Sequence, residues 1–432
     1  MFKTLGNAFK VKEIRKGMIL TVLLVLVYRI GSWLPVPGLY LDRFNEAVVG
    51  QDFLHLLSSI SGGALANGAI LAIGIAPYIS ASIIIQLLTI AIPSLERLSK
   101  MGDEGRKKIA FYNKIVALVL AIAQAVGIVF AFSDMLNTTM FGLELPVWVV
   151  GAIVATILVA GAMFTFWLGE KITELGVANG MSLLIFVGIL STAGFMILAN
   201  IQDIINGNTT AIWHFAAFLI ALIFIFAFIV FIDSAERKVP VQYAKQIKGR
   251  KMYGGQSTHI PIRVNSTGVM PIIFAMSILT FPQLLTSIFW PNSAFSDWYG
   301  QWLGAGSWIY IVLVGLLILF FAYFWSQVTF NPEDVSRNVQ QNGGFIPGIR
   351  PGKPTAEYLK KIANRITLFG AIFLGIIAIV PSLIFRGVSS DMSSLVNAFS
   401  ATGLLIVVSV ALELDKQLES QILMRNYKGF LK

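Results

Sequence analysis

The sequence predicts an all-α polytopic membrane protein with ten membrane-spanning helices. Three observations support this fold class: the composition, the length of the apolar stretches, and the distribution of the basic residues between them. The chain has 432 residues, of which 56% are hydrophobic and only 12% charged, whereas ordinary soluble domains are roughly 25% charged. This composition excludes a soluble globular protein.

Ten apolar stretches approach or exceed the roughly 20 residues that a helix needs to cross about 30 Å of hydrocarbon. The first follows a basic segment, as in a secretory signal, but it is long and lacks a small-x-small cleavage site, so we interpret it as a retained span. The stretches lie near residues 18–34, 68–92, 111–133, 146–167, 181–200, 211–232, 267–290, 308–330, 366–385 and 393–412.

The basic residues predict the orientation of these spans. Most of the 32 Lys and Arg lie before the first span, in every second loop, or after the last span, as cytoplasmic segments do. The loops at 134–145, 201–210 and 291–307 contain acidic residues but no Lys or Arg. We therefore expect both termini in the cytoplasm, and we attribute the net charge of +10 to membrane topology rather than to nucleic-acid binding.

A short repeat indicates two related halves. Gln-Leu-Leu-Thr at 86–89 recurs at 283–286, and each copy follows a Gly-x-x-Pro, at 74–77 and 268–271, inside an apolar stretch. Matched membrane helices interrupted by Gly and Pro in two halves of a chain point to a transport path between the halves. A chance match in Leu-rich sequence is the alternative.

The sequence offers no chemistry for an enzyme, a cofactor or a metal. The chain has no Cys and only three scattered His, which excludes disulfides, Cys-based zinc sites and thiol catalysis. No carboxylate pair, no nucleophile with a base and no cofactor loop occurs within the spans. The few charges lie at span ends: Arg29 is expected to snorkel from the outer end of the first span, and Glu170, Lys171 and Glu174 lie at the inner end of the fourth.

Modest polar side chains within the spans predict a seam that can open. Hydrogen bonds between membrane helices average under about 1 kcal/mol, which favours contact without locking it. Ordinary packing between helices is the alternative for each residue. The set comprises Ser80, Ser82, Gln86, Gln124, Asn265, Thr280 and Gln283.

The segment 53–64 predicts a short helix followed by a hinge. Residues 53–60 reach only about 12 Å as a helix, too short to cross the membrane, and Gly62-Gly63 follows them. Backbone at membrane depth is tolerated only when it is buried in protein or lines a cavity. The segment is therefore interpreted as a re-entrant plug, with an interfacial helix on the outer surface as the alternative.

The cytoplasmic loop at 233–265 predicts a hairpin that carries basic side chains. Val239, Val241 and Tyr243 alternate, Gly254-Gly255 supplies a turn, and a second alternation follows at 260–264. The loop either docks a ribosome or a motor ATPase, or merely sets topology and contacts anionic lipid. Its basic residues include Arg237, Lys238, Lys245, Lys248, Arg250 and Lys251.

The cytoplasmic loop at 331–365 predicts a rigid tip with Arg350 at its apex. The Gly352-Lys353 pair resembles part of a phosphate-binding loop, but Pro347 and Pro354 occupy positions that need Gly and Ser or Thr, which excludes nucleotide binding. Repeated Gly and Pro instead fix an exposed turn that presents one charge to a protein partner.

Six segments together resemble the SecY family of protein-translocon channel subunits. The likeness covers essentially the whole chain, and the order and spacing of the segments make it specific. They are Gly74-Ile-Ala-Pro77 through Gln86-Leu-Leu-Thr89, Trp167-Leu-Gly-Glu170-Lys-Ile-Thr173, Ala178-Asn-Gly180, Gln256-Ser-Thr-His259, Gly348-Ile-Arg350-Pro-Gly352 and Met424-Arg-Asn-Tyr427.

The resemblance implies two pseudo-symmetric, inverted halves of five spans, 1–205 and 206–432, around an hourglass pore. Spans two and three would face spans seven and eight across a lateral gate containing Ser80, Gln86, Gln124, Asn265 and Gln283. The plug would contain Phe53, Leu56, Leu57, Ile60, Gly62 and Gly63. The pore ring would consist of Ile75, Ile79, Met181, Ile185, Ile273 and Ile406, where Met181 replaces the usual branched aliphatic residue.

The resemblance also implies a protein-conducting channel of the bacterial plasma membrane, driven by the SecA motor or by the ribosome. Arg350 would serve SecA-driven export, while SecE-type and SecG-type subunits, signal peptides, nascent chains and anionic lipids would be the other partners. The main alternative is a secondary transporter of a small solute, which needs a midplane site with fixed polar ligands that the spans lack. A scaffold that conducts nothing is the third interpretation.

Overall fold

The computed structural model divides into two compact units. The first unit comprises residues 1–214, 277–310 and 388–432, and the second comprises 215–276 and 311–387. Each is considered by itself, and the expected division at 205 stays a prediction. The structure describes residues 2–49, 58, 61–140, 143–176, 178–205, 209–243, 246–248, 251–253, 257–265, 270–272, 274–275, 278–279, 282, 286, 293–303, 307–386 and 401–429.

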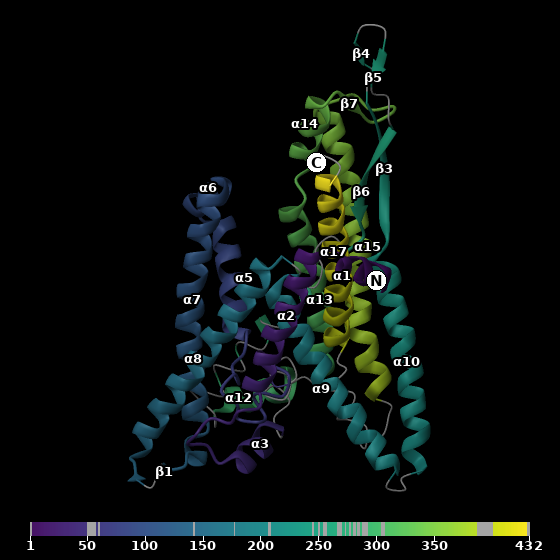
Figure 1. The fold of residues 1–432 in the computed structure, drawn as a ribbon. Coiled ribbons are helices and arrows are strands. Elements are labelled where there is room, and N and C mark those ends of the chain that lie inside the picture. The colour runs from purple at the N-terminus through teal and green to yellow at the C-terminus, as the bar shows by residue number, and fades with distance from the viewer. Residues whose placement is uncertain are drawn as a thin grey trace. The chain divides into compact units, whose positions relative to one another are not determined.

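The first unit begins with three helices (Figure 1), α1 (Phe2–Lys10), α2 (Lys12–Gly31) and α3 (Leu41–Val49). Ala8 and Ile14, from α1 and α2, are buried with Leu418 of the C-terminal helix α17 (Ala401–Gly429). The two ends of the chain are thus packed together within this unit, and α2 covers the first predicted span.

The second predicted span is helical only in part. Residues 61–75 form consecutive turns, and α5 (Ala76–Ala91) begins after them. Gly74 has a φ of 58° and Pro77 lies in the first turn of α5. A left-handed Gly interrupts the helical backbone, and Pro is favoured in a first turn because it has no N–H to leave unbonded. The apolar stretch predicted near 68–92 is therefore not one continuous helix, because α5 begins only at residue 76.

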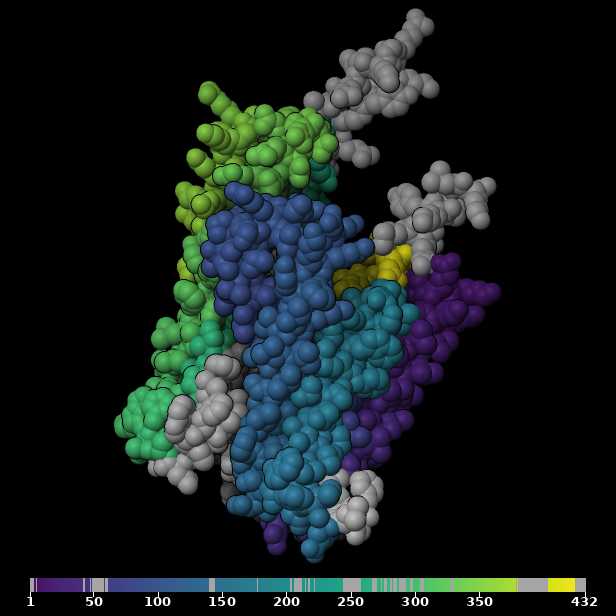
Figure 2. All heavy atoms as spheres, turned by 90° about the vertical axis from the view of Figure 1, so that its left-hand side faces the viewer, coloured from purple at the N-terminus to yellow at the C-terminus, as the bar shows by residue number. Residues whose placement is uncertain are grey.

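Long helices follow α5. The chain bends by 103° into the short α6 (Pro93–Lys100), then continues as α7 (Gly102–Ala131), α8 (Val147–Glu174) and α9 (Gly180–Ile205). Figure 2 shows α7 and α8 side by side. Smaller elements lie between or after them: η1 (Ser133–Met135), the hairpin of β1 (Thr139–Met140) and β2 (Leu143–Glu144), and α12 (Ala294–Leu303).

The core of the first unit lies between the turns at 61–75 and the helices α7 and α8. Leu65, Ala72 and Ile73 are buried there against Ala121 and Val154. Gly161 of α8 leaves room for the backbone carbonyl of Ile70, which a Cβ at position 161 would strike. The turns are consequently packed into the helical bundle.

The second unit combines helices with a small sheet. Its helices are α13 (Trp308–Thr329), α14 (Pro332–Gln341), α15 (Lys353–Arg386) and most of α10 (Thr209–Asp233). The sheet has the strand order β6-β3-β7, built from β3 (Glu236–Tyr243), β6 (Ser257–Arg263) and β7 (Gly344–Phe345), and a separate hairpin joins β4 (Gln246–Lys248) to β5 (Lys251–Tyr253).

The hairpin expected in the loop 233–265 is confirmed. β3 and β6 are antiparallel, with Val239 opposite Ile260 and Val241 opposite Thr258. Val239 and Val241 are buried with Leu359 of α15, so the alternation of the strand reflects one buried face. The sequence did not predict that β7, from the other large loop, would pair with β3 through Gln242 opposite Phe345.

Among the described residues, four helices are long and apolar enough to cross a membrane, or five if the bent pair α5–α6 counts as one span. They include α7, α8 and most of α9, together with a helix that begins at Trp308. The chain is therefore a multi-span membrane protein. Helices α2, α10, α15 and α17 overlap further predicted spans, and most of 267–290 lies outside the described residues. The total of ten spans stays a prediction.

Candidate functional site

Five of the six residues of the predicted pore ring belong to the first unit and can be located. Ile75, Ile185 and Ile406 are 6%, 5% and 7% exposed, and Ile79 and Met181 are half-buried. Ile273 lies outside the described residues. Ile75 immediately precedes α5, and its carbonyl accepts the N–H of Ile79 at 3.1 Å, so both lie on one turn. The ring itself stays a prediction.

The two further helices of the predicted ring are packed together. α9 carries Met181 and Ile185, and it contacts α17, which carries Ile406. The Met181 side chain lies against Gly169 of α8, where a Cβ at position 169 would be 2.8 Å from Cε of Met181. The structure thus places the thioether in a gap that Gly169 leaves in α8.

Hydrogen bonds in and around the loop between α8 and α9 fix the start of α9. They involve Thr173, Asn179 and Gly180, which belong to segments that resemble the SecY family. Thr173 Oγ1 accepts the N–H of Gly180 at 2.8 Å, and Asn179 Oδ1 accepts that of Met181 at 3.2 Å. A side-chain oxygen at this position satisfies a backbone donor of the first helical turn. From α17, Gln421 Nε2 donates to the carbonyl of Gly176. The start of the ring-bearing helix is therefore held by α8 and α17.

The predicted gate residues fall into both units. Ser80 and Gln86 of α5 and Gln124 of α7 are half-buried, and α5 packs along α7. In the second unit, Asn265 Nδ2 donates to Asp233 Oδ1 at 2.7 Å, which joins the segment two residues after β6 to the end of α10. Gln283 lies outside the described residues. The assignment of these residues to a gate stays a prediction.

An ion pair that sequence reasoning did not anticipate links α7 to α8. Lys114 Nζ lies 2.9 Å from Glu170 Oε2 and 5.5 Å from the ring centroid of Phe166. The Phe166 ring in turn contacts that of Tyr78 in α5, at 4.8 Å between centroids. Three helices thus meet at this cluster. The sequence signal that could have indicated this ion pair is Lys114, a charged residue inside an otherwise apolar stretch.

We expect a double-mutant cycle of Lys114→Met and Glu170→Gln to give a coupling free energy of about 0.5–1 kcal/mol, because partly exposed ion pairs are screened. The two side chains are 42% and 33% exposed. Thermal unfolding in detergent measures the coupling. The local pair Lys171–Glu174, which joins no two helices, is the matched control and should give about 0.3–0.5 kcal/mol. Equal coupling in both cycles would contradict a role in tying the helices together.

The two glycines of the hinge expected after residue 60 have left-handed backbone, and the hinge itself stays a prediction. Gly62 and Gly63 have φ values of 72° and 85°, a region that other residues adopt only with strain. Ser58 is buried, and its Oγ accepts the N–H of Ala66 at 3.1 Å. The other predicted plug residues, Phe53, Leu56, Leu57 and Ile60, lie outside the described residues.

Arg350 is exposed on a loop whose neighbours are fixed. Ile346 and Ile349 pack into the core under the sheet, and Thr355 Oγ1 donates to the Arg350 carbonyl at 2.8 Å. Ser336 of α14 donates to the carbonyl of Gly352 at 2.8 Å. The backbone on both sides of Arg350 is therefore held, while its guanidinium reaches solvent.

The basic residues of the first loop are distributed over two hairpins. Arg237 and Lys238 are exposed on β3, and Lys238 Nζ lies 3.6 Å from Glu236. Lys248 and Lys251 are paired across β4 and β5. Lys245 and Arg250 lie outside the described residues. Their assignment to a docking surface stays a prediction.

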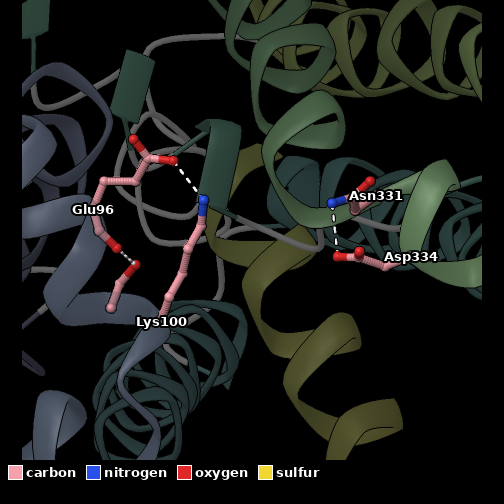
Figure 3. Close-up of polar contacts among 5 residues, drawn as sticks. Glu96, Lys100, Asn331 and Asp334 are labelled. Carbon is pink, nitrogen blue, oxygen red and sulfur yellow. Dashed lines mark hydrogen bonds and ion pairs between the residues drawn. The ribbon is translucent and has the colours of Figure 1, made fainter.

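Short polar contacts stabilise the ends of two helices outside the apolar spans (Figure 3). In α6, the Lys100 ammonium hydrogen-bonds Glu96 at 2.6 Å and holds the pKa of that carboxyl below its usual value. In α14, Asn331 caps the helix: its Oδ1 accepts the N–H of Glu333 and its Nδ2 donates to Asp334 at 2.8 Å. Both helices are thereby fixed locally.

Known proteins share both the sequence and the fold. A sequence profile of SecY matches residues 69–414. A protein translocase subunit SecY from Streptomyces galbus is 41% identical over 443 residues and covers 100% of each chain. The subunit of the same name from Corynebacterium glutamicum is 41% identical over 446 residues, with 99% of each chain covered.

Solved structures show the same architecture at lower identity. A protein-conducting channel has a TM-score of 0.63 at 18% identity, covering 93% of this chain and 90% of its own. A SecY structure, described by its plug domain that stabilises the closed state and maintains a membrane seal, has a TM-score of 0.64 at 19% identity, with the same shares covered. Sec61 in the canine ribosome-channel complex has a TM-score of 0.59 at 17% identity, again over 93% and 90%.

Proposed function

The chain belongs to the SecY family, and we propose that it is the channel subunit through which unfolded secretory polypeptides cross the plasma membrane of a bacterium. The observation that carries the proposal is the set of aliphatic residues Ile75, Ile79, Ile185 and Ile406 on three elements of the first unit. These elements lie in the same unit as the turns that follow the predicted plug. An aliphatic constriction formed by these residues would contact a polypeptide that passes through it.

Selectivity in such a constriction comes from the absence of ligands. An ion that enters an aliphatic ring loses hydration without gaining a partner, and this desolvation is costly. A polypeptide instead meets side chains that change rotamer and close around it.

Membrane-spanning segments of the substrate would leave through a lateral gate. The support is that Ser80, Gln86 and Gln124 are half-buried polar residues on α5 and α7, the two helices that would form one side of this gate. Weak polar contacts favour closure without preventing opening. Substrate segments would then partition into lipid according to their apolarity, since Leu favours insertion and Asp or Arg opposes it by about 3 kcal/mol at the helix centre.

The sheet region of the second unit would dock the ribosome or the SecA motor. Arg350 projects from a fixed loop and Arg237 lies exposed on β3, which are features of a surface that recognises an acidic partner. One structural relative is Sec61 in a ribosome-channel complex, which supports the ribosome as a partner. In this arrangement both termini and these loops are cytoplasmic, in agreement with the distribution of basic residues.

Exposed apolar faces would receive the remaining partners. Ile220, Ile223 and Phe224 of α10 are 70%, 66% and 73% exposed, more than a soluble protein tolerates in one patch. Lipid and small membrane subunits of the SecE and SecG type would cover such faces. Anionic lipid headgroups would contact the basic cytoplasmic segments.

A photoreactive residue at position 79 tests the proposed function. During export of a precursor, we expect crosslinks between this residue and the translocating chain, because Ile79 belongs to the predicted constriction. Position 119, where Val119 is 60% exposed on α7, is the matched control and should react with lipid or neighbouring subunits. A secondary transporter of a small solute predicts no crosslink to a precursor at either position, and that result would refute a protein-conducting pore.

A further inference from the structure

The short helix α12 presents three aromatic side chains on one face. Phe295, Trp298 and Trp302 follow the spacing i, i+3 and i+7, which places them on one side of a helix. They are 53%, 50% and 48% exposed, and the rings of Phe295 and Trp298 stack with their centroids 5.9 Å apart. We call these three residues the aromatic stripe. An exposed apolar surface of this kind marks a contact with something other than bulk water.

The next aromatic residue of α12 instead attaches the helix to the rest of the first unit. Tyr299 is 4% exposed, and its hydroxyl donates to the carbonyl of Leu279. The ring of Tyr299 also contacts that of Phe295, at 6.1 Å between centroids. The protein therefore holds α12 through Tyr299 and leaves the aromatic stripe uncovered.

The C-terminal end of α12 is joined to the start of a membrane span. Ser307 Oγ donates to the carbonyl of Trp302 and accepts the N–H of Tyr310 at 3.0 Å. Tyr310 lies in the first turn of α13, the helix that begins the span at Trp308. Trp308 and Ile309 are 64% and 43% exposed, as residues that face lipid are. Trp302 is therefore held close to the point where a span leaves the membrane.

The length and composition of α12 place it at the boundary between membrane and water. Its ten residues reach about 15 Å as a helix, which is half of the roughly 30 Å of hydrocarbon that a span must cross. Trp is enriched at membrane–water interfaces because its ring is apolar while its N–H still needs a hydrogen-bond partner. A short helix with such a face at the end of a span fits the interface.

The charge of the segment indicates which lipid surface it fits. Residues 291–307 contain no Lys or Arg, so the segment has no cation that could attract anionic headgroups. Interfacial helices bind through buried apolar area together with the attraction of basic residues to anionic lipid. Since the second contribution is missing here, we expect binding that depends on the aromatic stripe and not on headgroup charge.

The residue expected to reach the membrane surface from the first span is engaged within the protein. Arg29 Nη1 donates to the carbonyl of Gly62 at 3.2 Å, in the turns that precede α5. The expectation that Arg29 snorkels is therefore corrected. Arg29 differs in this respect from the aromatic stripe, whose residues keep about half of their surface outside the protein.

We propose that α12 is an interfacial helix that inserts the aromatic stripe into the boundary between lipid headgroups and acyl chains. Its partner is the lipid leaflet itself. The inference goes beyond the proposed function, because it depends only on the membrane location of the chain and not on what crosses the membrane. Through Tyr299 and Ser307, the inserted helix fixes the depth of Leu279 and of the start of α13.

A nitroxide label on α12 tests the proposal. The chain has no Cys, so a single introduced Cys is labelled without background. The full chain with Phe295→Cys, which keeps both Trp of the stripe, is labelled and reconstituted in phosphatidylcholine vesicles. Oxygen concentrates in lipid and a nickel chelate stays in water, so the ratio of their collision rates with the label, measured by electron paramagnetic resonance, reports depth.

The matched control is Gly300→Cys on the same helix. Gly300 is exposed, and a Cβ there meets nothing within 4 Å. It lies about 140–160° around the helix from each residue of the stripe. We expect the oxygen-to-nickel ratio at position 295 to be severalfold higher than at position 300. Equal ratios at the two positions would overturn the insertion of the stripe.

A double variant tests whether the two Trp hold the helix in place. With Trp298→Ser and Trp302→Ser combined, the ratio at position 295 should fall toward that at position 300. Trp148→Ser is the control, because Trp148 is 76% exposed at the start of α8 and its loss should leave the ratio unchanged. A double variant with the parental ratio would contradict anchoring by the stripe.

Other outcomes would identify a different occupant and overturn the proposal. Ready access of nickel to position 295 would place the stripe in water, and poor access of both reagents would show that the chain itself covers it. Dipolar broadening between labels would indicate a second copy of the chain. Added phosphatidylglycerol should leave the ratio unchanged; insertion only in its presence would show recognition of anionic headgroups instead.

Discussion

Deleting residues 53–63 should convert an ion-tight channel into one that conducts ions in a planar bilayer. The segment contains five large apolar side chains at 53, 54, 56, 57 and 60, and each such side chain contributes about 1.5–3 kcal/mol when it is buried. Loss of even one contribution of that size shifts the balance between closed and open channels by on the order of tenfold or more. Removal of all five should leave the pore open for most of the recording.

The control for this deletion is the hairpin of β1 and β2 in the same unit. Removing residues 139–144 leaves ends that are already joined, because the N–H of Leu145 donates to the carbonyl of Thr138 at 2.8 Å. This variant should remain silent. A silent bilayer after deletion of 53–63 would instead show that another part of the chain forms the seal, and would favour the scaffold interpretation.

Arg350→Glu should abolish export that depends on the motor ATPase while leaving the fold intact. The side chain is exposed, and its residue is held through the backbone carbonyl, which accepts the Thr355 hydroxyl. Reversing a charge that faces an acidic partner replaces attraction with repulsion, at a cost of several kcal/mol. Binding of the motor should therefore weaken on the order of a hundredfold or more, which can be measured with inverted membrane vesicles and a labelled precursor.

Arg337→Glu is the matched control for this variant. Arg337 is exposed on α14, within the same unit, and its reversal changes the net charge by the same amount without altering the loop tip. Export near the parental level is expected. If both variants lose export equally, the net charge of the surface explains the effect and a specific role of Arg350 is contradicted. Normal export by Arg350→Glu would also contradict that role.

The features that could be predicted from the sequence are those encoded by a pattern of neighbouring residues. The apolar stretches give the helices because their length and composition are set by the membrane, and the alternation of Val239, Val241 and Tyr243 gives β3 because one face of that strand is buried. Gly62 and Gly63 have the left-handed backbone that adjacent glycines suggest, while their role as a hinge stays a prediction. Each of these signals lies within one continuous segment of the chain.

The features that the sequence did not disclose depend on partners far away in the chain. β7 has two residues and no pattern of its own, yet it completes the sheet with β3 about a hundred positions earlier. Lys114 and Glu170, like Arg29 and Gly62, are unremarkable until the fold brings them together. The interruption before α5 was visible as Gly74 and Pro77, but the extent of the turns depends on packing against α8.

The pairing of β3 with β7 has a mechanical consequence. β3 begins three residues after α10 ends, and α15 begins eight residues after β7. If a partner binds the Arg350 loop as proposed, force on that loop would therefore also reach β3 and, through it, α10. The sheet would then transmit force from one contact to both α10 and α15.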